Sequence, residues 1–344
     1  MAKLTIPVMH KVSVVITTCN LELYLEEAIL SVLKQTRIPD EIIIADDHST
    51  DETEKIFERF KGKVIVIRHE NKIGALKNTL SGLMEASGDI IGFLDADDSW
   101  MPDKLEKIVA EFEKDEQYVI ISHDHEHMDE QGHFLDKEDD TNSNVNRITQ
   151  NYSPDEWGRI FRKSILFREG YWFGSAYMVR RSVIDMVSFN RMIGENEELA
   201  RWSFLDLVMG PYIVATNPKG KIGFVNEKLF RYRSHHSNSS GSTADRQRAM
   251  SSLQRSQYVN RLTRIAIRDH VNDPGIDKQF RDLDTIYELV RYQYEGKKIS
   301  ALVQFIRIIP KLIAHHLFIK EFKRLGLTTF LGVNKFIQLK NKHA

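Results

Sequence analysis

Residues 90–105 of this chain read IIGFLDADDSWMPDKL, and they place three carboxylates directly after an apolar run. Asp95, Asp97 and Asp98 would repel one another at the end of a buried strand. Capping of the next helix accounts for Asp98 or Ser99, but it does not account for Asp95 at the strand end. A hard divalent cation such as Mg²⁺ or Mn²⁺ prefers carboxylate oxygens and would offset the repulsion. The stretch therefore predicts a metal site at Asp95 and Asp97.

Strand-like and helix-like patterns alternate on the N-terminal side of this stretch. Four apolar runs predict strands buried on both faces: 12–18 (VSVVITT), 41–45 (EIIIA), 63–67 (KVIVI) and 90–94 (IIGFL). Helical patterns lie between them at 21–33 and 74–86, and Ser49 with Glu52 predicts a capping box for a further helix. This alternation is typical of parallel βαβ units with helices on both faces of the sheet. It predicts an α/β, Rossmann-like, mostly parallel sheet.

Polar residues follow several of these strands. In parallel sheets, ligands bind outside the carboxyl ends of the strands, so we expect these residues to converge on one crevice. They are Thr17, Thr18, Asn20, Asp46, Asp47, Asp95 and Asp97.

The same segments carry a resemblance to a known family. VSVVITTCN, IIIADDHSTDET, NKIGA and FLDADDSWMPDKL occur in this order and at this spacing. Together they closely resemble the family-2 glycosyltransferases of the GT-A fold, which are inverting enzymes that use nucleotide sugars. The resemblance covers roughly residues 10–240. His48 stands where the family usually has Gly, so this turn would be tighter or would adopt φ > 0 at some cost. Lys77 stands where the family usually has Arg.

The resemblance implies a role for each matching position. The donor-binding positions would be Thr18 and Asn20 against the base and ribose, Asp46 near the ribose, Asp47 at the base edge, and Lys77 near the phosphates. Asp97 would ligate the metal that bridges the diphosphate, and Asp95 would bond the ribose or help to hold the metal. In the segment 222–240, His235 would be a ligand to the metal or the pyrophosphate, and Arg233 would pair with phosphate.

An inverting transfer needs a base on the acceptor hydroxyl. Aligning Trp202 with the family's aromatic residue places Glu197 and Glu198 at its acidic pair, with Glu198 as the base. Glu198 replaces the usual Asp, and Glu195 lies close enough to compete. The alternative is a solvated acidic helix N-terminus, which the helix dipole favours.

Two other segments invite a functional interpretation. HDHEH (123–127) has alternating His and acid, which would put the three histidines on one strand face and the two acids on the other. We expect this segment to be a solvated surface strand, because zinc ligands on a single short strand are unusual. Residues 172–183 would form the floor of the acceptor site, with Trp172 stacking on a sugar ring, or would simply be core.

The C-terminal part has a different pattern and charge. After the Ser-rich stretch 237–245, helix-like segments follow at 246–270, 277–295 and 299–324. This predicts a catalytic domain at 1–240 and a helical extension at 241–344. Residues 297–344 hold ten Lys/Arg against one acid, whereas the formal charge of the whole chain is −1. The basic segment would either pack on the catalytic domain or lie on an anionic membrane face. The acidic body disfavours nucleic acid as a partner.

These observations favour a metal-dependent inverting glycosyltransferase in cell-surface polysaccharide synthesis. The donor would be a UDP-sugar, and the acceptor a glycan or a lipid-linked sugar. One cysteine, Cys19, and an N-terminus without a secretion signal point to the cytoplasm, or to the inner face of the membrane. One alternative is a nucleotidyltransferase, but this sequence has no Gly- and Arg/Lys-rich loop after the first strand to hold a triphosphate. Another is a catalytically inactive sugar-nucleotide binder or a membrane-associated assembly protein. A dehydrogenase is disfavoured because no GxGxxG follows the first strand.

Overall fold

The computed structural model describes residues 10–342 except 168–173, 236–245, 272–273 and 315–316. The chain divides into two compact units, Met1–Ser234 and His235–Ala344. The expected domain boundary at residue 240 falls in a stretch that the structure does not describe. Each unit is treated separately below.

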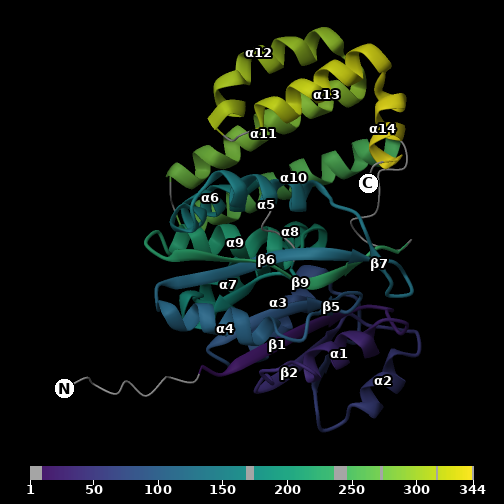
Figure 1. The fold of residues 1–344 in the computed structure, drawn as a ribbon, viewed down its shortest axis with the longest axis vertical. Helices are drawn as coiled ribbons and strands as arrows, with labels where there is room; N and C mark the ends of the chain where they lie inside the picture. The colour runs from purple at the N-terminus through teal and green to yellow at the C-terminus, as the bar shows by residue number, and fades with distance from the viewer. Residues whose placement is uncertain (1–9, 168–173, 236–245, 272–273, 315–316, 343–344) are drawn as a thin grey trace, which may run out of the picture. The chain divides into compact units, whose positions relative to one another are not determined.

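The first unit is a mixed sheet flanked by helices (Figure 1). Its strands are β1 (Val12–Thr18), β2 (Glu41–Asp46), β3 (Ile65–Arg68), β4 (Ile90–Asp95), β5 (Ser99–Trp100), β6 (Tyr118–Met128), β7 (Phe134–Leu135), β8 (Met178–Arg180) and β9 (Lys221–Arg233). Its α-helices are α1 (Leu25–Leu33), α2 (Thr53–Arg59), α3 (Ala75–Glu85), α4 (Lys104–Lys114), α5 (Asp140–Asn151), α6 (Pro154–Phe167), α7 (Met186–Gly194), α8 (Glu197–Trp202) and α9 (Leu205–Thr216). The strand order is β3-β2-β1-β4-β8-β6-β9-β5, with β7 paired to β6.

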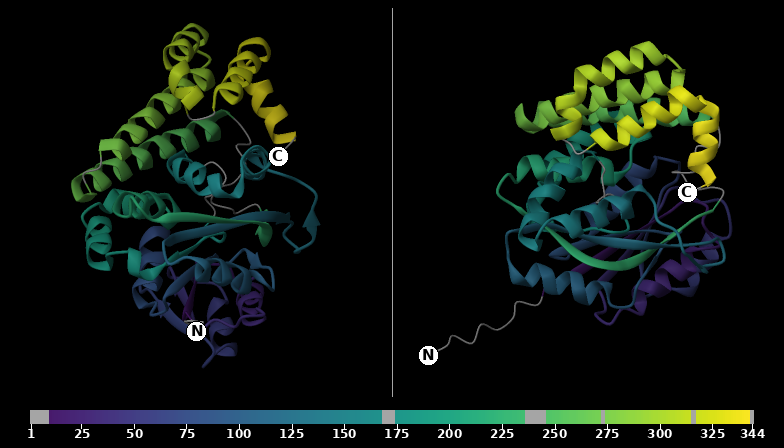
Figure 2. Two further views of the ribbon diagram at one scale, coloured as in Figure 1. Left: turned by 60° about the vertical axis from the view of Figure 1, so that its left-hand side comes forward. Right: turned by 45° about the horizontal axis from the view of Figure 1, so that its top comes forward.

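The sheet has a parallel half and a mixed half. β3, β2, β1 and β4 are all parallel, as the βαβ pattern predicts. β8 is antiparallel to both β4 and β6, while β6 and β9 run parallel and side by side (Figure 2). The predicted α/β fold is confirmed, and the strands beyond β4 add the antiparallel pairs.

Alternation along β1 distributes its side chains between two helical layers. Val12, Val14 and Ile16 pack in one core with buried residues of α1, α2 and α4. Val15 faces the other layer, where α3 approaches so closely that a Cβ at Gly82 would lie 2.4 Å from Val15 Cγ1. Both faces of β1 are therefore buried, which explains its uninterrupted β-branched sequence.

Two local expectations were wrong. α2 begins at Thr53, and its N-cap residue Glu52 makes no capping side-chain hydrogen bond, so Ser49 does not start the helix. The segment 123–127 is indeed within a strand, but His123, His125 and His127 are at most 3% exposed. β6 is an interior strand between β8 and β9, and α4 and α5 contact it. Register shifts on either side of Asp124 also break the simple alternation of faces.

The second unit is helical. It contains α10 (Arg246–Val271), α11 (Pro274–Glu295), α12 (Lys298–Ala314), α13 (Phe318–Leu331) and α14 (Val333–Lys342). The expected helix over 299–324 is divided between α12 and α13. A small core joins α10, α11 and α14 through Leu253, Val290, Tyr294, Val333, Phe336 and Ile337. Among the described residues, no helix is both long enough and apolar enough to cross a membrane.

The close approach of α3 to β1 yields a stability prediction. Gly82→Ala should lower the free energy of unfolding by about 1–2 kcal/mol, because the overlap with Val15 outweighs the better helix propensity of alanine. In a Val15→Ala background, which removes the overlapping methyl groups, the same substitution should cost much less. Chemical denaturation of the four proteins measures this coupling. Equal costs of Gly82→Ala in both backgrounds would contradict the proposed contact.

Candidate active site at the carboxyl edge of the sheet

The carboxyl ends of three neighbouring parallel strands meet at one edge of the sheet. In the register of β1 with β2 and β4, Thr18 lies opposite Asp46, and Thr17 lies opposite Asp95. Thr17 Oγ1 donates a 2.9 Å hydrogen bond to Asp95 Oδ1. The backbone N–H of Asp47 donates to the carbonyl oxygen of Thr18 at 3.0 Å. The strand ends therefore converge, as their order in the sequence predicts.

The three carboxylates after β4 do not share one environment. Asp98 is 3% exposed; its Oδ2 accepts a 2.6 Å hydrogen bond from Ser175 Oγ, and its Oδ1 accepts from the Arg233 backbone N–H at 3.1 Å. Asp95 is exposed and Asp97 is half-buried. One carboxylate is thus part of the internal structure, and two remain at the solvent side of the sheet edge.

The pKa values of Asp95 and Asp98 are raised. Although Asp95 is exposed, desolvation by the surrounding protein and the charge of Asp97 raise its pKa to about 6, against the hydrogen bond from Thr17. Burial, followed by the charges of Asp97 and Asp95, raises the pKa of Asp98 well above its usual value. In both residues desolvation is the larger cause of the raised pKa, and the charges of neighbouring carboxylates add to it. Carboxylate oxygens are the ligands that Mg²⁺ and Mn²⁺ prefer, and Asp97 and Asp95 are the residues that would hold the ion.

Ser175 organises this edge, and sequence reasoning did not identify it. Its hydroxyl accepts a 3.0 Å bond from the backbone N–H of Asp95 while donating to Asp98. Its carbonyl oxygen accepts from Trp100 Nε1 at 3.1 Å and from the buried Lys104 ammonium. Lys104 Nζ also lies 3.8 Å from the centre of the Trp100 ring, and burial lowers its pKa well below the usual value.

Arg233 is buried beside the turn that follows β4. Its guanidinium is 1% exposed and donates to the Asp97 carbonyl oxygen at 2.8 Å and to Glu27 at 2.6 Å. It also lies 4.8 Å from the Tyr24 ring centre. Arg233 holds the Asp97–Asp98 turn from within, and its expected pairing with a phosphate stays a prediction. The pairing of Arg233 with Met128 at the end of β9 places its side chain beside this turn. The sequence motif alone does not indicate that position.

The turn after β2 is held by Asp46. This residue is fully buried, its Oδ1 accepts from the Ser49 backbone N–H at 3.2 Å and from the Ser49 hydroxyl, and its Oδ2 lies 3.5 Å from Arg68 Nε. His48 has φ 60°, so the expected left-handed turn is present with a non-glycine residue. The carboxylate supports the turn, and a contact with ribose stays a prediction.

Asp47 connects this turn to the start of α3. Its Oδ1 accepts from the Ile73 N–H at 2.7 Å, and its Oδ2 accepts from the Gly74 N–H at 3.1 Å. Lys77 lies half-buried in the first turn of that helix. The backbone around α3 is thereby positioned beside the ends of β1 and β2.

Asn20 and Thr18 lie at the end of β1. Asn20 has φ 56°, and its Oδ1 accepts from the Thr50 N–H at 2.8 Å. The Thr18 hydroxyl is buried and, among the described residues, makes no hydrogen bond. A buried hydroxyl without a partner at the expected base and ribose position is compatible with a polar ligand.

The expected acceptor-side residues are only partly described. Glu197 is exposed at the first position of α8, whereas the side chains of Glu198 and Trp202 lie outside what the structure describes, as does Trp172. His235 is half-buried and follows the end of β9 by two positions. The catalytic and metal-binding roles of these residues remain predictions.

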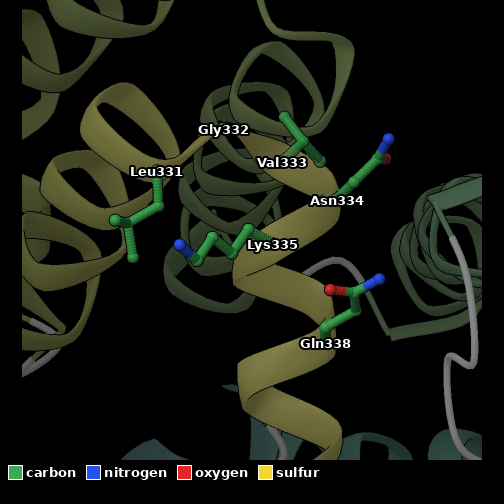
Figure 3. A pocket seen from close by; sticks show the side chains of 6 residues that line it. All are labelled: Leu331, Gly332, Val333, Asn334, Lys335 and Gln338. Atoms are coloured by element: carbon green, nitrogen blue, oxygen red, sulfur yellow. The ribbon is translucent and has the colours of Figure 1, made fainter.

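An open depression of about 470 Å³ lies elsewhere, at the junction of α13 and α14 (Figure 3). It is lined by Leu331, Gly332, Val333, Asn334, Lys335 and Gln338. Its lining has a single charged side chain and no acid, so it does not provide the carboxylate chemistry of the sheet edge.

Comparison with known sequences agrees with this geometry. The model of glycosyl transferase family 2 matches residues 13–178. An uncharacterized glycosyltransferase of Nostoc sp. (strain PCC 7120) is 31% identical over 262 residues, which cover 73% of this chain and 74% of that protein. The UDP-Glc:alpha-D-GlcNAc-diphosphoundecaprenol beta-1,3-glucosyltransferase WfgD of Escherichia coli is 35% identical over 102 residues, which cover 29% of this chain and 40% of that protein.

Solved structures share the fold. The crystal structure of S. aureus TarS 1-349 superposes with a TM-score of 0.55 at 18% identity, covering 94% of this chain and 92% of that chain. The same protein in complex with UDP-GlcNAc gives a TM-score of 0.51 at 16% identity, covering 95% and 82% of the two chains. The strand order, the carboxylates after β4 and the sequence relatives lead to one conclusion: this chain is a glycosyltransferase with the GT-A fold and belongs to glycosyltransferase family 2.

Proposed function

We propose that this enzyme is a metal-dependent, inverting glycosyltransferase that moves a sugar from a UDP-sugar to a hydroxyl group of a glycan or lipid-linked acceptor. The observation that carries the proposal is the pair Asp95 and Asp97 at the edge where β1, β2 and β4 end, where desolvation and the charge of Asp97 raise the pKa of Asp95 to about 6. Mg²⁺ or Mn²⁺ bound there would neutralise the charge that develops on the departing nucleoside diphosphate.

The donor would lie along the ends of β1 and β2. Thr18 offers a buried hydroxyl without a partner among the described residues, and Asn20 is exposed beside it. Asp47 and Asp46 would face the base and ribose, and Lys77 would approach the phosphates from the first turn of α3. UDP is favoured because WfgD is named for UDP-Glc, and TarS is known in complex with UDP and UDP-GlcNAc.

The acceptor would be activated by an acid of α8. Glu198 would accept the proton of the attacking hydroxyl, which then reaches the anomeric carbon on the side opposite the leaving nucleotide and inverts its configuration. α8 packs on α3, the helix that carries Lys77, so both helices belong to one layer beside the sheet edge. Glu197 precedes Glu198 and is exposed.

The second unit would bring the enzyme to an anionic membrane surface on the cytoplasmic side. α12 and α13 each expose a row of apolar side chains at helical spacing: Ile299, Leu302, Val303, Ile306 and Ile313 on α12, and Ile319, Phe322 and Phe330 on α13. Arg307, Lys320 and Lys323 are exposed on the same helices. Lys311 and Arg324 make ion pairs with Asp282 and Glu321. A lipid-linked acceptor is favoured because two relatives are named for undecaprenol-linked acceptors.

The metal assignment is tested by Asp97→Asn, which removes one charge and keeps the side-chain shape. Calorimetry should show that Mn²⁺ strengthens UDP binding to the wild-type enzyme and that this gain is largely lost in the variant. Asp155→Asn, which removes an exposed carboxylate from the first turn of α6, is the matched control and should bind as the wild type does. Unchanged Mn²⁺-dependent affinity in Asp97→Asn would refute the assignment.

The base assignment is tested by Glu198→Gln. Donor binding should persist, while the transfer rate should fall by the ~10²–10⁴-fold that is typical of a positioned general base. Glu195→Gln, at the end of α7, should have a much smaller effect, as should Glu197→Gln. A full-rate Glu198→Gln enzyme would exclude Glu198, and a selective loss in Glu197→Gln would assign the base to that residue.

The membrane assignment is tested by co-sedimentation with vesicles that contain phosphatidylglycerol or only phosphatidylcholine. The full chain should bind the anionic vesicles, and salt should weaken the binding. The double variant Lys320→Gln/Lys323→Gln should bind at least roughly tenfold more weakly, since each basic residue near the surface contributes ~1 kcal/mol. Ile306→Ser/Phe330→Ser should also reduce binding, whereas Val187→Ser, an exposed position on α7, should not. If the full chain does not bind, the exposed rows serve another contact.

A further inference from the structure

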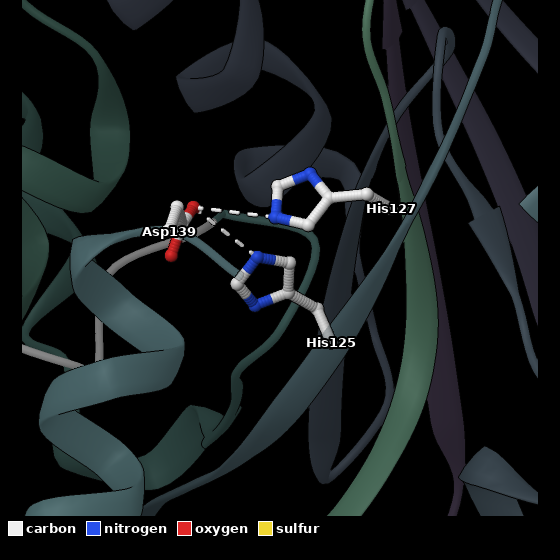
Figure 4. A group of neighbouring side chains, drawn as sticks. All are labelled: His125, His127 and Asp139. Carbon is white, nitrogen blue, oxygen red and sulfur yellow. Dashed lines mark ion pairs between the residues drawn. The ribbon is translucent and has the colours of Figure 1, made fainter. Parts of the chain in front are cut away.

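A buried cluster outside the carboxylate edge has the composition of a transition-metal site. His125, His127 and Asp139 each offer one ligand atom, and these atoms all lie within 4.8 Å of one another. The two histidines come from β6, and Asp139 comes from the N-cap position of α5 (Figure 4). None of the three residues belongs to the Asp95 and Asp97 site.

The three side chains point toward a common centre. His125 Nε2 lies 3.3 Å from Asp139 Oδ2, and His127 Nε2 lies 3.7 Å from the same oxygen. Tetrahedral Zn²⁺ with bonds of about 2.0–2.2 Å separates its ligand atoms by about 3.3 Å. The two separations from Asp139 are close to this value, and the ligand atoms, which all lie within 4.8 Å of one another, would draw together around an ion.

The ligand atoms are held by neighbouring groups in the manner of metal sites. The two carboxylate oxygens of Asp139 have different neighbours. Oδ1 accepts hydrogen bonds from the Thr141 and Asn142 N–H groups at 2.7 and 3.0 Å, and Oδ2 faces the two histidines. His125 Nδ1 lies 3.5 Å from Asp124 Oδ1, so its Nε2 is the nitrogen that faces the centre. Asn142 Nδ2 in turn donates to Asp124 Oδ1 at 2.7 Å. A carboxylate behind a histidine orients the ring and raises its basicity as a ligand.

His127 gives the most direct indication of a missing ligand. Its side chain is 2% exposed, and neither ring nitrogen makes a hydrogen bond of ordinary geometry within the described residues. Buried polar nitrogens normally have partners, and a cation would provide one.

The surroundings exclude most water but leave an approach. Phe230 stacks on His125 with ring centres 5.3 Å apart, and Tyr232 meets the His127 ring edge-on at 5.7 Å. The Asp139 side chain is 31% exposed, which leaves a path for an ion and for one water ligand. Two imidazoles and one carboxylate suit Zn²⁺ better than Mg²⁺, which prefers oxygen ligands alone.

We propose that His125, His127 and Asp139 bind a Zn²⁺-type transition-metal cation, with water as the fourth ligand, and that this ion fastens the start of α5 to β6. The site is structural, and it is independent of the proposed donor chemistry. It also lies beside the functional edge: His127 pairs with Tyr232 of β9, and the next residue, Arg233, holds the Asp97–Asp98 turn.

The experiment uses the full chain, stripped of metal by a chelator and then titrated with Co²⁺, whose visible absorption reports tetrahedral coordination. The wild type should develop an intense tetrahedral band with one equivalent, and Zn²⁺ should displace the Co²⁺. Zn²⁺ should also raise the melting temperature, because it binds the folded state. Asp139→Asn should weaken Co²⁺ binding by about 100-fold or more, since even loss of outer partners of a metal site costs 10–100-fold.

Asp139→Asn is the main variant because asparagine also caps helices well, so α5 keeps its start. His127→Gln should show the same loss, with circular dichroism to confirm that it folds. His133→Gln, at a histidine whose side chain is 78% exposed, and Asp97→Asn should both retain the tetrahedral band. The proposal is overturned if the wild type shows no such band, or if the band survives Asp139→Asn and disappears in Asp97→Asn.

Discussion

Repulsion among the carboxylates after β4 is the constraint around which the functional edge is built. Three acids within four residues cannot all face one space without cost, and the structure separates them. Asp98 turns inward to Ser175 and Arg233, which leaves Asp95 and Asp97 at the solvent side. Because Ser175 precedes β8 and Arg233 ends β9, this one buried carboxylate joins three strands. The open pair keeps its position through that internal contact.

The parallel half of the sheet was predictable because its signals are local. β1, β2 and β4 are buried on both faces, so their sequences are mostly apolar and end in polar residues. The register then places Thr17, Thr18, Asp46 and Asp95 together, without further information. β6 was not predictable in this way. Its polar sequence suggests a solvated strand, and only its non-local neighbours, β8 and β9, make it an interior one.

Site residues with local sequence signals were predicted, and those that depend on distant parts of the chain were missed. Arg233 and Lys104 carry charges that usually remain in water, and both are buried here. Arg233 is compensated by Glu27, which lies 206 positions away in the chain, and Lys104 by the carbonyl oxygen of Ser175, which lies 71 positions away. No pattern in the sequence around either residue specifies such a partner. Motifs therefore located the carboxylates, and the long-range contacts that orient them required the structure.

The shortness of β8 has a consequence for how the first unit holds together. This three-residue strand is the step between β4 and β6 in the sheet, and therefore between the nucleotide-type half and the half that carries β9. Its register gives it two paired positions with β6, at Met178 and Val179. Other contacts, such as the pairing of β5 with β9, also connect the two halves. Ser175, just before β8, hydrogen-bonds Asp95 and Asp98, so a change that loosens β8 would reach the carboxylate edge as well as the sheet.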